Sequence, residues 1–149
     1  MKKVLIVEDD GFKRDALVSV VSEILFPVEI DNVSDVRSAI VAVNEKVFDL
    51  IIIDMALPSH PVISGGGSPL SLLTGGLEVL FELRSLGRKD ECIVITQYQS
   101  IEISGTFFPV SSAAQAIQEH FFCKVLACIE YLEESTTWKV SLTDILRRI

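Results

Sequence analysis

The sequence predicts a doubly wound α/β fold, in which one five-stranded parallel sheet carries five helices on its two faces. Short apolar runs alternate with amphipathic stretches along the chain, which is typical of a parallel sheet covered by helices. The runs are continuously apolar, as in strands buried on both faces. The chain has 149 residues, the length of one ordinary domain, and 49% of them are hydrophobic, which is enough for a sizeable core.

Five apolar runs are predicted as the strands of the sheet. They are VLIV (4–7), VEI (28–30), LIII (50–53), CIVI (92–95) and VLACIEY (125–131). The sequence contains no internal repeat and no recognisable second domain. Residues 1–149 are therefore expected to form a single domain, with no attached output domain.

A helix is predicted after each strand, because apolar side chains recur there at spacings of three and four residues. The five sets lie within 17–24, 36–43, 80–86, 113–121 and 138–146. Asp10 is expected to cap the first helix, and Ser34 is expected to cap the second. Gly87 follows the third helix, where a left-handed residue commonly ends a helix.

Two connections are longer than the roughly two to six residues usual in α/β folds. Residues 58–75 are rich in Pro, Ser and Gly, and residues 97–110 form the other long loop. They follow the third and fourth predicted strands. Both loops are therefore expected at the C-terminal edge of the sheet, where open α/β sheets bind their ligands.

Acidic side chains follow two of the predicted strands at the point where each strand ends. Glu8 and Asp9 come directly after the first strand, and Asp54 comes directly after the third. In the flavodoxin-like strand order 2-1-3-4-5, strands one and three are neighbours, so these carboxylates would meet. Mg²⁺ would relieve their repulsion and leave coordination positions for a phosphate. The sequence thus predicts a magnesium site, with solvated loop acids as the alternative.

Composition excludes several classes of protein. The formal net charge of −8 argues against binding to duplex DNA or to an anionic membrane. No apolar run approaches the roughly 18–20 residues of a membrane span, and the N-terminal run ends in acids, unlike a secretory signal. A cytoplasmic location is therefore expected. Cys92, Cys123 and Cys128 form no CxxC pair and lie among apolar residues, which predicts reduced core thiols.

Four segments in order resemble the receiver domain of two-component response regulators. They are KKVLIVEDD, LIIIDMALP, GLEVLFELR and CIVIT, and the resemblance covers residues 1–96 well and the remainder loosely. The last segment ends in Thr96, whose hydroxyl either contacts a phosphoryl group on Asp54 or belongs to an ordinary strand end.

The resemblance implies a phosphorelay function. Asp54 would accept a phosphoryl group from a sensor histidine kinase or a phosphotransfer protein, and Thr96 would hold a phosphoryl oxygen. Mg²⁺ would be bound by Asp54 and Asp9, by Glu8 through water and by the backbone carbonyl of Ala56. The receiver would catalyse no reaction beyond its own phosphorylation and dephosphorylation. It would signal to an unidentified downstream protein, with no nucleic acid or membrane as partner, and a homodimer stays open.

One departure from the family concerns a lysine. The family carries Lys, usually followed by Pro, at the end of strand five, and Tyr131 falls near that position in this sequence. Lys124 and Lys139 are the candidates to replace it, although Lys124 falls at the beginning of the strand. Without this lysine, one charge-assisted contact to the phosphoryl group would be lost.

Other departures concern the loops. Gly76 follows Asp54 by twenty-two residues, where the family has about eight, and the insertion contains SGGGS at 64–68. Gln97 stands where the family usually carries a small residue. These departures keep open a degenerate receiver that binds its partner independently of phosphorylation. A Mg²⁺-dependent phosphatase is less favoured, because position 56 is Ala where such enzymes usually carry a second acid.

Overall fold

A computed structural model describes residues 1–61, 71–72 and 74–149 of the chain. The SGGGS segment lies outside the described residues. The main sheet has the order β2-β1-β3-β6-β9, and all its neighbouring strands are parallel. Its strands are β1 (Lys2–Val7), β2 (Val28–Val33), β3 (Leu50–Ile53), β6 (Glu91–Thr96) and β9 (Lys124–Glu130). The predicted fold class and strand order are confirmed.

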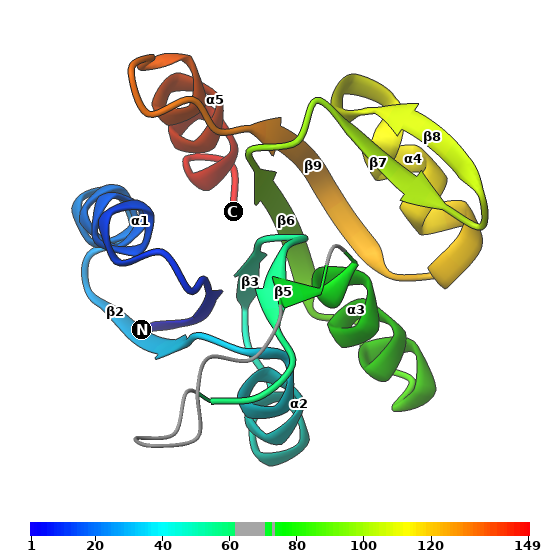
Figure 1. The fold of residues 1–149 in the computed structure, drawn as a ribbon. Coiled ribbons are helices and arrows are strands. Elements are labelled where there is room, and N and C mark those ends of the chain that lie inside the picture. Colours follow the sequence, from blue (N-terminus) through cyan, green and yellow to red (C-terminus); the bar gives the residue numbers. More distant parts are fainter. Residues whose placement is uncertain (62–70, 73) are drawn as a thin grey trace, which may run out of the picture.

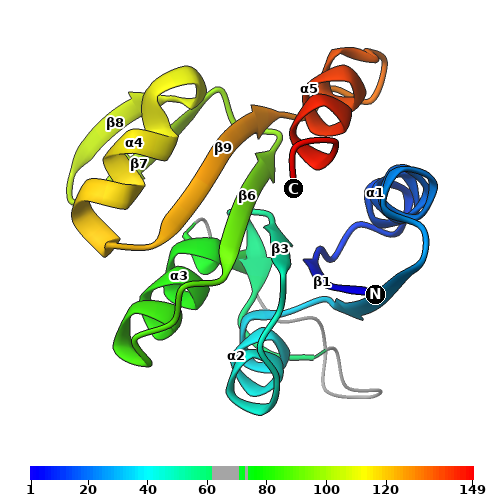
Figure 2. The ribbon, with the colours of Figure 1, turned by 180° about the vertical axis from the view of Figure 1, so that it is seen from behind.

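Five helices cover the two faces of this sheet. They are α1 (Gly11–Leu25), α2 (Val36–Glu45), α3 (Gly75–Ser85), α4 (Val110–Phe121) and α5 (Thr137–Leu146). Helices α1 and α5 lie on one face, and α2, α3 and α4 lie on the other (Figure 1). Figure 2 shows the same division from behind. None of the helices in the described part of the chain is long and apolar enough to cross a bilayer.

The core consists of two apolar layers separated by the sheet. Alternate residues of each central strand point into opposite layers, so Val4 and Ile6 contact the α1–α5 side while Leu5 and Val7 contact the other. All four side chains are fully buried. This explains why the first strand reads as a continuous apolar run rather than an alternating one.

The helix ends agree with the sequence at two positions of three. Asp10 caps α1, since its side chain accepts a hydrogen bond from the Lys13 backbone N–H. Gly87, which follows α3, has a φ of 66°, as a left-handed residue past a helix end requires. The prediction for α2 was wrong by one residue: Asp35 rather than Ser34 is the cap, and its side chain accepts from Ser38 N.

The two predicted long loops contain short strands. Residues 97–110 were expected to be a loop, but β7 (Ser100–Ile103) and β8 (Thr106–Pro109) form an antiparallel hairpin that packs on α4. Its two turn residues, Ser104 and Gly105, both have positive φ, as tight hairpin turns favour. In the other loop, β4 (Leu57–Pro58) pairs with β5 (Ser71–Leu72).

The three thiols are free, as the sequence predicts. Cys92 and Cys123 are buried, and Cys128 is half-buried. Burial raises the pKa of the Cys92 thiol, and it raises the pKa of Cys128 to about 12. These cysteines are therefore unreactive core residues at neutral pH.

Candidate functional site

Three carboxylates converge at the C-terminal edge of the sheet. The register pairs Val7 of β1 with Ile53 of β3, so Glu8 and Asp54 leave the sheet side by side. One ligand atom from each of Glu8, Asp9 and Asp54 lies within 4.8 Å of the others. The predicted meeting of the three acids is therefore confirmed.

The acids line a small cavity at this edge. It has a volume of about 220 Å³, and its lining residues are Glu8, Asp9, Asp10, Lys13, Asp54, Ala56 and Gln97. We call it the acidic cavity. Glu8 is 1% exposed and Asp54 is 8% exposed, whereas Asp9 is exposed to solvent. The site is thus open on the Asp9 side and closed behind the other two acids.

A buried lysine that the sequence analysis did not single out lies among these acids. Lys13 is in the first turn of α1 and is 1% exposed. Its Nζ lies 2.6 Å from Glu8 Oε1 and 3.1 Å from Asp54 Oδ2, and it donates a hydrogen bond to the backbone oxygen of Ile95 at 2.7 Å. Positions 13, 17 and 20 share one helix face, so the apolar stripe of α1 already indicated that Lys13 faces inward.

The net negative charge of the acidic cavity favours a divalent cation. Burial raises the pKa of Glu8 to about 7, and the charge of Asp54 adds to this rise while Lys13 opposes it. Within the described part of the chain, Glu8 Oε1 is buried and has an ion contact to Lys13 but no partner at hydrogen-bond geometry. When all are ionised, three carboxylates and one ammonium leave two negative charges. Hard oxygen ligands with this charge fit Mg²⁺.

The acceptor candidate Asp54 is held from two directions. Its Oδ1 accepts a hydrogen bond from Met55 N at 2.7 Å, and its Oδ2 faces Lys13. The N-terminus of α3 presses against its backbone, since a Cβ placed on Gly76 would lie 2.3 Å from the Asp54 carbonyl oxygen. The glycine after the insertion is therefore required by close backbone approach.

Thr96 ends β6 and is buried beside this site. Its hydroxyl oxygen accepts a hydrogen bond from Tyr98 N at 3.3 Å, and Thr96 is not among the residues lining the acidic cavity. Tyr131 N donates to the Thr96 backbone oxygen at 2.7 Å, which brings the end of β9 alongside.

The structure brings neither Lys124 nor Lys139 to the acidic cavity. Lys124 is the first residue of β9, and its Nζ lies 3.2 Å from Glu91 Oε1 at the opposite edge of the sheet. The Lys139 Nζ lies 5.6 Å from the ring centre of Trp138 on α5. The cation beside Asp54 comes instead from α1, which the candidates chosen from the sequence missed.

Tyr131 directly follows the last residue of β9, near the position expected to carry lysine. Its ring centre lies 5.4 Å from Lys13 Nζ, a cation–π distance, and 4.9 Å from the ring centre of Trp138. The buried tyrosine thus packs between the lysine of α1 and the tryptophan of α5.

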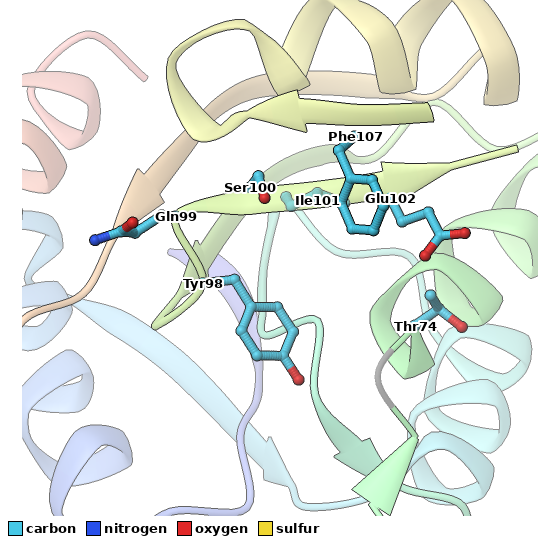
Figure 3. A pocket seen from close by; sticks show the side chains of 7 residues that line it. All are labelled: Thr74, Tyr98, Gln99, Ser100, Ile101, Glu102 and Phe107. Carbon is cyan, nitrogen blue, oxygen red and sulfur yellow. The ribbon is translucent and has the colours of Figure 1, made fainter. Parts of the chain in front are cut away.

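A second cavity, of about 280 Å³, lies between the β7–β8 hairpin and the start of α3. The side chains of Tyr98 and Phe107 flank it, and Thr74 lies across from the hairpin (Figure 3). Burial and the charge of Asp54 raise the pKa of Tyr98, which places the phenol within electrostatic range of the acidic cavity. Gln97 lines the acidic cavity itself, so the segment after Thr96 separates the two spaces.

Comparison with known proteins places the chain in a family. No family model matches it. The chain is 35% identical over 147 residues to the Detocs response regulatory protein DtcB of Vibrio alginolyticus. The matched region covers 97% of this chain and 99% of that protein.

Solved structures share the fold. The response regulator TrrA of Thermotoga maritima, in complex with Mg²⁺ and BeF, superposes with a TM-score of 0.60 at 20% identity, covering 98% of this chain and 99% of that one. The receiver domain of the sensor histidine kinase PA1611 of Pseudomonas aeruginosa, with Mg²⁺ in its active-site cleft, gives 0.62 at 17% identity, covering 99% and 95%. The chain therefore belongs to the response regulator receiver family, together with the Detocs response regulatory protein DtcB.

Proposed function

We propose that this chain accepts a phosphoryl group on Asp54 from a phosphohistidine of a sensor histidine kinase or phosphotransfer protein, with Mg²⁺ as cofactor. The observation that carries the proposal is the convergence of Glu8, Asp9 and Asp54 within 4.8 Å at one edge of the sheet. Receiver domains as a class work with such donors. Signal output would pass through contacts with a downstream protein in the cytoplasm.

The residues of the acidic cavity fit the metal. Asp9 and Asp54 would hold Mg²⁺ directly, Glu8 through water, and the Ala56 carbonyl would complete the protein ligands. Asp9 is the exposed member of the set, so the metal would enter from its side. When bound, Mg²⁺ supplies charge neutralisation and orients the phosphoryl oxygens for in-line transfer.

The transfer itself requires a nucleophile and a leaving group. A carboxylate oxygen of Asp54 attacks phosphorus, so that an O–P bond forms as the N–P bond of phosphohistidine breaks. The leaving imidazole nitrogen keeps the bonding electron pair and takes up a proton. The Met55 N–H bond to Oδ1 fixes the carboxylate plane during this step. The Thr96 hydroxyl, which accepts from Tyr98 N, would then donate its own hydrogen to a phosphoryl oxygen.

A mass measurement tests the proposal. The purified chain is incubated with a small phosphodonor and Mg²⁺, and its intact mass is recorded. We expect a gain of one phosphoryl group in the wild type and in the control Asp49→Asn, whose exposed side chain accepts from Lys3 N away from the cavity. Asp54→Asn and the wild type in excess chelator should show no gain. An Asp54→Asn protein modified like the wild type would reject Asp54 as the acceptor.

A second candidate function is a receiver that binds its partner independently of phosphorylation. The observation that favours it is the Lys13–Asp54 ion pair, because Asp54 is already paired with a cation before any metal binds. This candidate predicts no mass gain in the wild type. It also predicts that Asp54→Asn binds the partner with unchanged affinity.

A further inference from the structure

We infer that Lys13 is the cation that contacts the phosphoryl group on Asp54, in place of the lysine that the receiver family carries at the end of strand five. The inference rests on the proposed function and adds a residue to it. It assigns the phosphoryl-contacting role to helix α1 rather than to β9.

The burial of Lys13 demands an explanation. Lysine is almost never fully buried unless it is paired, and Lys13 is 1% exposed. Its ammonium carries three N–H donors, and three acceptors surround it: Glu8 Oε1, Asp54 Oδ2 and the Ile95 oxygen. Two of these acceptors belong to the acidic cavity. These contacts therefore fix the position of the Lys13 ammonium at the acidic cavity.

Lys13 is the cationic side chain that pairs with Asp54 in the described residues. Of the ion pairs found there, only that between Lys13 and Asp54 involves the acceptor carboxylate. Near the strand-five position lies Tyr131, whose phenol packs beside the Lys13 ammonium. Tyr131 and Lys13 thus form a pair in which the aromatic ring contacts the ammonium at a cation–π distance.

Phosphorylation changes which acceptor Lys13 meets. The attacking oxygen becomes the bridging oxygen of an acyl phosphate, a mixed anhydride, and loses most of its charge, while the phosphoryl group brings three strong acceptor oxygens. Lys13 Nζ, 3.1 Å from Oδ2, needs only a small shift to contact one of them while keeping its bond to the Ile95 oxygen. Because Lys13 belongs to α1, this contact would change the conformation of the α1–α5 side of the molecule. The change would pass through the contact of Lys13 with Tyr131 and that of Tyr131 with Trp138.

The test uses beryllofluoride, a phosphoryl mimic, together with Mg²⁺, and measures its affinity by ¹⁹F NMR. We expect Lys13→Met to weaken beryllofluoride binding about ten- to hundred-fold, as loss of a hydrogen bond to a charged group requires. Lys46→Met removes an exposed lysine that pairs with Glu29 and Asp31, and should bind like the wild type. Mg²⁺ affinity is measured in parallel and should not fall, since Lys13 repels the metal.

A relocation variant separates contact from folding. Lys13→Met combined with Tyr131→Lys moves the lysine to the family position, and should recover at least part of the lost beryllofluoride affinity. A purely structural role for Lys13 predicts no such recovery. Should Lys13→Met fail to fold, the assigned ¹⁵Nζ resonance of Lys13 in the wild type decides: it should shift when beryllofluoride binds.

The outcomes distinguish this inference from the proposed function. If the wild type and Lys46→Met bind beryllofluoride while folded Lys13→Met binds equally well, Lys13 does not contact the phosphoryl group and the inference alone is overturned. An unmoved Lys13 Nζ resonance in the bound wild type has the same meaning. If the wild type neither binds beryllofluoride nor gains a phosphoryl group, the proposed function fails and the inference falls with it.

Discussion

Lys13 Nζ lies 3.1 Å from Asp54 Oδ2, so a helix supplies the positive charge that faces the proposed acceptor carboxylate. Both side chains are buried, and Glu8 shares the same ammonium. Removing one partner of a buried ion pair leaves the other charge uncompensated, which costs far more than the pair itself contributes. The charge balance of the cavity therefore depends on all of its members at once.

Lys13 and Asp54 should be strongly coupled in stability. In metal-free protein, Lys13→Met should lower the free energy of unfolding by roughly 3 kcal/mol, because Glu8 and Asp54 then repel without a counter-ion. Adding Asp54→Asn should restore part of this loss, giving a coupling energy of about 1–3 kcal/mol in a double-mutant cycle. Urea unfolding of the four proteins measures it. Additive losses would mean that the two groups do not interact in solution.

The stability of the metal-free protein should depend on the protonation of Glu8. Burial raises the pKa of this carboxyl from its ordinary value of 4.5 to about 7 in the folded protein, so the folded state holds the proton more tightly than the unfolded state. Stability should therefore fall as pH rises from about 4.5 to about 7, by roughly 1–3 kcal/mol. Urea unfolding across this range measures the slope, and Glu8→Gln should flatten it. An equal slope in wild type and variant would contradict the assignment to Glu8.

Gly76 should be intolerant of any side chain. A Cβ there would lie 2.3 Å from the Asp54 carbonyl oxygen and 2.5 Å from Met55 Cε, so the backbone beneath the acceptor must shift. We expect Gly76→Ala to lower the free energy of unfolding by roughly 1–3 kcal/mol and to reduce phosphorylation. Gly11→Ala is the matched control, because its nearest neighbour would be Arg14 Nη2 at 3.6 Å, an ordinary contact. Equal behaviour of the two variants would contradict the close approach.

The buried thiols should resist alkylation in the native protein. The pKa of Cys128 is raised to about 12 and that of Cys92 is also raised, in both cases by burial, so neither forms thiolate near neutral pH. At about pH 8, iodoacetamide should label the native chain slowly and the urea-unfolded chain rapidly. Mass spectrometry of the labelled peptides gives the rates. Rapid native labelling of Cys128 would show that this strand is less protected than the structure indicates.

The site acids could be predicted from the sequence because the ends of the strands can be predicted from it. Glu8, Asp9 and Asp54 directly follow apolar runs, and one strand order brings those runs together. Lys13 escaped prediction because a long charged side chain is ordinarily assigned to the surface, whatever face of the helix it occupies. Its contact with the Ile95 oxygen joins residues that are 82 positions apart in the sequence, and no local sequence pattern predicts such a contact.

The β7–β8 hairpin was missed for a different reason. In SIEISGTFFP, the buried Ile101 and Ile103 alternate with the exposed Glu102, and Ser104 and Gly105 form the turn. This period of two is a strand signal. The length of the connection and its polar residues favoured a loop, whereas the buried isoleucines join the core beside α4.

For α2, the choice between Ser34 and Asp35 rested on adjacent residues of similar capping strength.

The ends of β1 and β3 should form one cation site, and a Mn²⁺ titration followed by NMR measures whether they do. Paramagnetic Mn²⁺ in place of Mg²⁺ should broaden the backbone resonances of residues 8–10 and 54–56 first and saturably, and excess Mg²⁺ should reverse the effect. Asp9→Asn should weaken the binding. If no saturable broadening appears, or if it centres on another acidic pair such as Glu29 and Asp31, the three carboxylates do not act as a cation site and Asp54 lacks the metal that the proposed phosphorylation requires.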